Sequence, residues 1–229
     1  MRYSIYIKNI IRGLGKLHEK KIVHRDFHTG NILLEHNGYG SLIADMGLCG
    51  EVGNVDATKI YGVMPYVAPE VLRGKAYTQA ADIYSFGMVM YFVATGRQPF
   101  ADRAHDQNLA LSICNGIRPE ITEKYAPKCY IDLMKRCWDP NPDSRPNAWK
   151  MQGFLNFEYS KNDNDSEIAK QFEEAYEYKK ANLLTIENNQ ATTHPQAIYT
   201  SQLLNPYTKD LPKYDNINNG SVECIDFTK

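Results

Sequence analysis

The feature that most restricts the fold is an apolar stretch in the middle of the chain, residues 79–95, which reads QAADIYSFGMVMYFVAT. Thr78 precedes it and is a favoured N-cap, while Gly96 follows it and is the residue type that commonly ends a helix. The longest apolar run within it, Phe86 to Ala94, is too short to cross a bilayer. We therefore predict a long buried helix in a mainly α fold.

Further helices are expected on both sides of this one. An amphipathic helix opens the chain and ends near Glu19, because Ile7, Ile10, Ile11, Leu14 and Leu17 recur at helical spacing. Later helices are predicted around residues 107–115, 129–137 and 148–157, separated by prolines. Between residues 31 and 45, NILLEHNGYGSLIAD places two aliphatic runs around an Asn-Gly turn, which predicts a small β-hairpin. A loop is predicted from residue 47 to residue 69.

The chain divides into three parts. Residues 1–157 are predicted to form one domain. A break at SKNDND opens a second part, residues 158–190, whose segment 166–184 reads as a charged amphipathic helix. Residues 191–229 are polar, rich in Asn and Tyr and without periodicity, so we predict that this tail is disordered.

Charge and cysteine content exclude several functions. The net charge is −1 and the chain has no run of Lys or Arg, which argues against partners such as nucleic acid or an anionic membrane. The five cysteines include no CxxC pair, so reduced thiols are expected rather than a zinc site or disulfides. With no signal peptide at the start, a cytoplasmic location is predicted, with the nucleus as the alternative.

Asp26, Asn31 and Asp45 are the residues that suggest chemistry. Asp26 and Asn31 bracket a tight loop, and Asp45 lies at the far end of the predicted hairpin, which would bring all three together. Two carboxylates and an amide oxygen suit Mg²⁺, with one carboxylate left to accept a proton. Singly, each of these residues is also common in ordinary loops and helix caps. The other histidines considered, His18, His36, His105 and His194, show no pattern of partners.

Taken in order, five motifs resemble the C-terminal lobe of the eukaryotic-type protein kinases. HRDFHTGN (residues 24–31) resembles the catalytic loop and ADMG (44–47) the metal-binding motif. YVAPE (66–70) resembles the end of the activation segment, and DIYSFG (82–87) and RCWDPNPDSRP (136–146) resemble later helical signatures. Five motifs in family order are far more specific than any one of them.

The resemblance implies an ATP-dependent phosphotransferase acting on a protein substrate. Asp26 would accept the proton of the substrate hydroxyl, and Asn31 and Asp45 would hold the Mg²⁺ ions that bridge the ATP phosphates. Leu33 would lie under adenine. Arg25 would meet a phosphate that an upstream kinase adds to the activation loop, at Thr58 or Tyr61.

The resemblance also implies structural roles for five residues. Asp82 would brace the catalytic-loop backbone, and Glu70 and Arg145 would form a buried ion pair. His24 and Met46 would stack into the core.

Three departures from the family pattern affect the prediction. His28 stands where the Ser/Thr enzymes usually have Lys, and Val63 stands where they usually have Thr; we interpret this as a matched change that leaves His28 to imitate the Lys. Serine or threonine is the favoured acceptor, with tyrosine as the alternative. The residues before His24 hold no Gly-rich loop and no strand Lys, so we expect a truncated form that is inactive alone. The alternative function is a non-catalytic, pseudokinase-like binding module.

Overall fold

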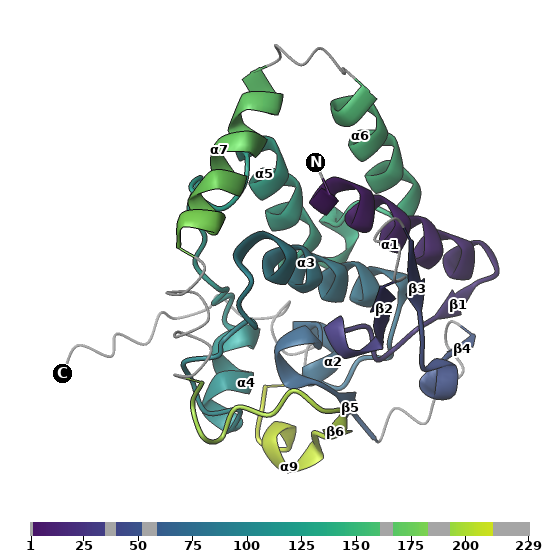
Figure 1. Ribbon diagram of the computed structural model, residues 1–229. Helices are drawn as coiled ribbons and strands as arrows, with labels where there is room; N and C mark the ends of the chain where they lie inside the picture. Colours follow the sequence, from purple (N-terminus) through teal and green to yellow (C-terminus); the bar gives the residue numbers. More distant parts are fainter. Residues whose placement is uncertain (1, 35–39, 52–58, 161–166, 183–192, 213–229) are drawn as a thin grey trace.

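Helix α3, Gln79–Thr95, runs through the centre of the molecule, as the sequence predicts (Figure 1). The Thr78 hydroxyl accepts a hydrogen bond from the Ala81 amide, and Gly96 ends the helix with a φ of 72°. Residues 81–91 of the helix are all buried. The computed structural model describes residues 2–34, 40–51, 59–160, 167–182 and 193–212.

Two of the described helices, α1 and α5, pack against α3, and α6 packs against α1. α1, Arg2–Glu19, buries Ile7, Ile10, Ile11 and Leu14 and contacts both α3 and α6, Ala148–Ser160. α5, Lys128–Cys137, lies along the other side of α3. A Cβ at Gly87 would lie 2.9 Å from the Cβ of Cys137, so glycine is required for this close approach of α3 and α5.

Shorter helices complete the mainly α fold. α2, Pro69–Leu72, packs against α4, Gln107–Cys114, whose first turn is capped by Asp106. α7, Glu167–Ala181, matches the predicted charged helix. The predicted helices around residues 107–115, 129–137 and 148–157 all form, with ends within a few residues of those expected. None of the helices in the described ranges is both long and apolar enough to span a membrane.

Within the described residues, three small antiparallel sheets lie beside the helices. β2, Ile32–Leu34, pairs with β3, Ser41–Ile43, as the predicted hairpin requires; its turn lies outside the described residues. β1, Ile22–Val23, pairs with β4, Gly50–Glu51, and β5, Tyr61–Gly62, pairs with β6, Gln202–Leu203. β4 and β5 therefore fall within the segment that was predicted to be a loop.

The C-terminal tail departs from the prediction of disorder over residues 193–212. This segment passes beside α4 and returns to β5, where it forms β6 and then α9, Asn205–Thr208 (Figure 1). Leu204 is fully buried and Leu211 is 8% exposed. The few apolar residues of the tail thus pack against the helical domain. The average composition of the whole tail does not reveal this packing.

Candidate active site

The loop from His24 to Asn31 is held by one buried carboxylate. Asp82, in the first turn of α3 and 1% exposed, accepts hydrogen bonds from the backbone amides of His24 (2.8 Å) and Arg25 (3.1 Å). Arg25 adopts a left-handed φ of 70°, and these bonds help to hold it there. The Asp82 carboxylate fixes the entry to the loop.

His18 also binds Asp82, which the sequence did not indicate. Its Nε2 lies 3.0 Å from Oδ2 of Asp82, and its backbone carbonyl accepts a bond of 2.7 Å from the Gln79 amide group. The pair is separated by 64 positions in the chain, so no local pattern could have predicted it. The end of α1, the start of α3 and the loop therefore form one polar cluster.

Asp26, His28 and Asn31 lie together inside this loop, and each is less than 10% exposed. The Asn31 side-chain nitrogen donates to the Asp26 carbonyl (2.9 Å) and approaches Oδ2 of the same residue (3.4 Å). Nε2 of His28 lies 3.6 Å from Oδ2 of Asp26. Nδ1 of His28 accepts a hydrogen bond from the Gly30 amide (3.1 Å), so in the neutral ring the proton sits on Nε2, facing the carboxylate.

The Asp26 carboxyl is tuned toward its ionised form. Burial by itself raises the pKa of Asp26, but the His28 imidazole beside the carboxylate and the Ser201 hydroxyl together bring this pKa below its usual range. Oδ1 of Asp26 is buried and receives no hydrogen bond of ordinary geometry from the part of the chain that is described. The site therefore holds an ionised carboxylate whose Oδ2 faces Asn31 and His28 and whose Oδ1 lies beside Gly62.

Asp45 is brought to the same edge by the hairpin. The Ala44 amide donates to the Asn31 carbonyl (2.8 Å), and the Ala44 carbonyl lies 3.1 Å from Nε2 of His24. Asp45 follows directly, with a left-handed φ of 55° and its carboxylate accepting from the Gly47 amide (3.2 Å). The hydrogen bond between Ala44 and Asn31 therefore holds Asp45, the next residue in the chain, close to Asn31.

His24 and Met46 differ in their environments. His24 is fully buried and its ring meets Phe27 edge to face, with centroids 5.5 Å apart, so it packs in the core. Met46 is 44% exposed, which contradicts the expectation that it stacks into the core. It lies in a short 3₁₀ helix, Met46–Leu48, in which no residue is buried.

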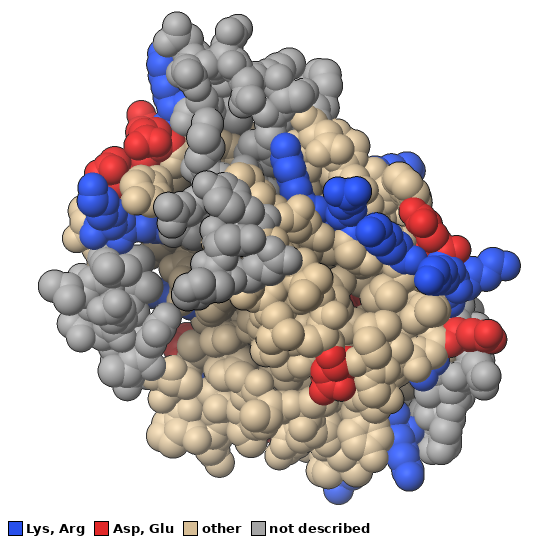
Figure 2. Space-filling model, turned by 45° about the vertical axis from the view of Figure 1, so that its right-hand side comes forward, with Lys and Arg blue, Asp and Glu red and all other residues tan. Residues whose placement is uncertain are grey.

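Apolar side chains are exposed around the hairpin. Leu33, Leu34 and Leu42 are each more than half exposed, and Met46 lies beyond the end of the same hairpin. Figure 2 shows the face of the molecule that carries α1 and the hairpin. Residues other than Lys, Arg, Asp and Glu occupy most of the centre of this face. Leu33, the residue expected under adenine, is therefore on an open apolar surface.

The three residues with expected regulatory roles are only partly described. Arg25 donates to the Glu51 carbonyl (3.0 Å) and so links the catalytic loop to β4. Tyr61 begins β5 and is 38% exposed, and its carbonyl accepts a hydrogen bond from the Tyr77 hydroxyl. Thr58 lies outside the described residues.

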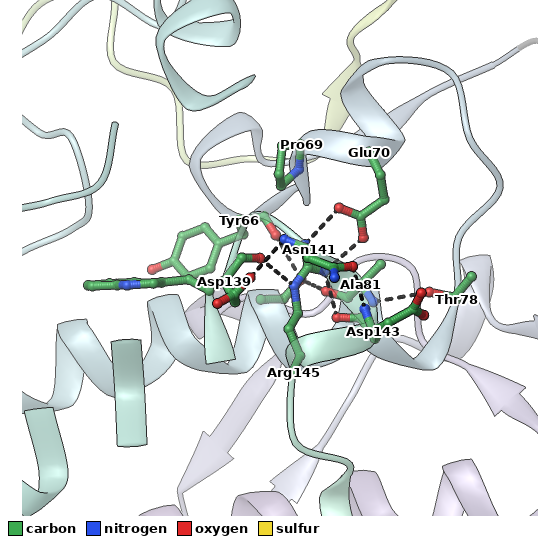
Figure 3. A network of polar contacts seen from close by, with 12 residues as sticks. Tyr66, Pro69, Glu70, Thr78, Ala81, Asp139, Asn141, Asp143 and Arg145 are labelled. Atoms are coloured by element: carbon green, nitrogen blue, oxygen red, sulfur yellow. Dashed lines mark hydrogen bonds and ion pairs between the residues drawn. The ribbon is translucent and has the colours of Figure 1, made fainter. Parts of the chain in front are cut away.

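Glu70 and Arg145 form a bidentate ion pair in the interior (Figure 3). The two guanidinium nitrogens lie 2.7 and 2.8 Å from the two carboxylate oxygens, and neither side chain is more than 2% exposed. Arg145 also donates to the carbonyls of Asp139 and Ala80, each at 2.9 Å. This pair ties the end of the activation segment to the region before α6.

Comparison with known proteins identifies similar sequences over this part of the chain. The chain matches the protein kinase domain over residues 2–160. A probable serine/threonine-protein kinase of Dictyostelium discoideum is 31% identical over 147 residues, which cover 64% of this chain and 11% of that protein.

Two further relatives bear on the acceptor residue. The human receptor-interacting serine/threonine-protein kinase 1 is 34% identical over 159 residues, covering 61% of this chain and 24% of that protein. A seven transmembrane domain-containing tyrosine-protein kinase of Dictyostelium discoideum is 35% identical over 152 residues, covering 64% of this chain and 22% of that protein. The matched region is thus a minor part of each relative. The motifs, the mainly α fold and the match over residues 2–160 show that this chain belongs to the protein kinase family.

Proposed function

We propose that this chain supplies the catalytic half of an ATP-dependent protein kinase, in which Asp26 accepts the proton of a protein hydroxyl. Serine or threonine is the favoured acceptor, because the relatives named above include two serine/threonine kinases; tyrosine is the alternative. The observation that carries the proposal is the buried Asp26 carboxylate, which lies beside Asn31 in a loop that Asp82 fixes.

The residues at this edge fit ATP and Mg²⁺. Nδ2 of Asn31 is turned toward Asp26, which leaves its Oδ1 on the other side of the amide, and Asp45 offers a carboxylate; both are oxygen ligands of the kind Mg²⁺ prefers. Asn31 and Asp45 would hold the ions and Leu33 would contact the base. When bound, Mg²⁺ neutralises charge on the transferring phosphate.

The chain's own groups would act on the acceptor. Asp26 is ionised at neutral pH because its pKa is below the usual value, so it can accept a proton through Oδ1. Asn31 and His28 fix the direction of the carboxylate through Oδ2. Arg25 would bind a phosphate placed on the activation loop at Thr58 or Tyr61 by an upstream kinase, exchanging its bond to Glu51 for a stronger, charge-assisted one.

Phosphate transfer tests the proposal. The groups expected to hold the α- and β-phosphates are not among residues 1–229, and positioning dominates this reaction. We expect the chain by itself to bind Mg-ATP weakly and to transfer phosphate negligibly. The same chain joined behind the upper lobe of a related kinase should phosphorylate a mixture of Ser-, Thr- and Tyr-containing peptides.

Two results would contradict this expectation. Turnover of ATP by residues 1–229 alone would show that the missing phosphate-binding groups are not needed. A joined protein that folds and binds nucleotide but transfers no phosphate would favour the second function, a binding module of the pseudokinase kind.

His28 should affect the rate and its pH dependence in the joined kinase. The His28 imidazole beside Asp26 lowers the pKa of that carboxyl, so His28→Ala should raise the pKa and move the acidic limb of the pH–rate profile to higher pH. His28→Lys should keep or increase the rate, because it restores the residue usual in the family. Initial rates and pH–rate profiles of the three proteins provide the measurement; identical profiles would make His28 a bystander.

A further inference from the structure

The start of the C-terminal segment 193–212 is anchored by the loop before α4. The His105 amide donates to the Gln196 carbonyl (3.0 Å), and the Ile198 amide donates to Nδ1 of His105 (3.0 Å). The Tyr199 ring packs edge-on against His105 with centroids 4.8 Å apart, and its hydroxyl donates to the Pro99 carbonyl (2.9 Å). His105 is 2% exposed, and its Nδ1 is paired with the backbone of Ile198 in this segment.

The same segment is anchored downstream by β5. Gln202 pairs with Gly62 and Leu203 pairs with Tyr61, which adds β6 as a second strand. The Leu204 amide donates to the Ile60 carbonyl (2.7 Å), and the Ile60 amide donates to the side-chain oxygen of Asn205 (2.9 Å). Backbone pairing of this kind is how many protein sites bind an extended peptide.

Ser201 lies between the two anchors, at the Asp26 carboxylate. A Cβ at Gly62 would lie 3.6 Å from Oδ1 of Asp26, so β5 runs directly beside that oxygen. Gly62 pairs with Gln202, the neighbour of Ser201, and the Ser201 hydroxyl interacts with the Asp26 side chain. Ser201 itself remains exposed.

Thr200 offers a matched comparison. It is the adjacent hydroxyl residue and is also exposed. In the described part of the chain, no contact joins Thr200 to Asp26.

We infer that Ser201 is an intramolecular phosphorylation site, which residues 193–212 hold in the position of the acceptor substrate. The inference rests on the proposed function. Oγ of Ser201 forms a bond to the γ-phosphorus of ATP, the bond from that phosphorus to the β–γ bridging oxygen breaks, and ADP leaves with the electron pair. The hydroxyl proton of Ser201 passes to Oδ1 of Asp26.

The product of this step would weaken the contact that allowed it. A phosphate on Ser201 carries about −1.5 to −2 charge and would face the Asp26 carboxylate. Repulsion between the two groups should release Ser201 and the adjoining strand β6 from β5. The site is then open to other protein substrates.

Phosphate mapping in the joined kinase tests the inference. With Mg-ATP and the peptide mixture present, mass spectrometry should find phosphate on Ser201 at a rate that does not depend on protein concentration. Ser201→Ala should lose this signal, and Thr200→Ala should keep it. Phosphorylated peptides without phosphate on Ser201 would overturn the inference and leave the proposed function intact, whereas no transfer to any acceptor would overturn both. A rate that rises with protein concentration would overturn the intramolecular reaction.

Hydrogen exchange in the 229-residue chain tests the placement of Ser201 without catalysis. Ser201→Asp brings a second carboxylate to Asp26, so the amides of Ile60 and Leu204 should exchange about fivefold faster or more than in Ser201→Ala. Thr200→Asp is the control for added charge and should leave their exchange unchanged. Equal exchange in Ser201→Asp and Ser201→Ala would show that Ser201 does not lie at Asp26.

Discussion

Arg145→Ala is expected to lower the free energy of unfolding by about 3–5 kcal/mol, because it leaves the Glu70 carboxylate buried without its partner. The carbonyls of Asp139 and Ala80 lose a donor in the same substitution. For a domain of this size the melting temperature should fall by about 10 °C. Thermal unfolding followed by circular dichroism provides the measurement.

Two controls separate the effect of the unpaired Glu70 carboxylate from a general loss of stability on substitution. Lys128→Ala removes an exposed ion pair with Asp132 on α5 and should leave the melting temperature unchanged. The double variant Glu70→Met with Arg145→Met removes both charges and should recover part of the loss. A melting temperature unaffected by Arg145→Ala would contradict the structural role of this pair.

Asp26→Asn is expected to reduce phosphate transfer by the joined kinase about 10²- to 10⁴-fold, the range that general base catalysis contributes. The amide has the shape of the carboxylate but cannot accept the proton at Oδ1. Because Asp26 is not expected to bind nucleotide, the KM for ATP should change little while kcat falls. Steady-state kinetics with a peptide acceptor measures both constants.

Asp132→Asn, which neutralises an exposed carboxylate on α5, serves as the matched control and should keep the parent rate. The melting temperature of Asp26→Asn should remain close to that of the parent, which separates lost chemistry from lost folding. If Asp26→Asn transferred phosphate at the parent rate, another group would have to accept the proton.

Much of the helical architecture could be predicted from local sequence. Thr78 and Gly96 mark the ends of α3 because capping depends on neighbouring backbone groups only. The spacing of Ile7, Ile10, Ile11 and Leu14 predicts the buried face of α1, and Asn37-Gly38 predicts the hairpin strands that flank it. Asp26 and Asn31 lie close together for the same reason, since one short loop contains both.

The exposure of Met46 could not be predicted in this way. Burial depends on which element packs across a side chain, and the motif specifies only the residue's own backbone. The contact between His18 and Asp82 could not be predicted either, because it depends on how the end of α1 packs against the start of α3.

The sequence by itself determined the family, the order of the helices and the composition of the catalytic loop, because motifs, caps and periodicity are local properties. Only the tertiary structure decided where residues 193–212 lie. Their composition predicts disorder, yet Leu204 is buried and Gln202 pairs with Gly62, because β5 offers backbone groups and an apolar surface that lie far away in the chain. The contact between β5 and residues 193–212 is stabilising only when both segments are folded, so the sequence of either segment alone does not reveal it.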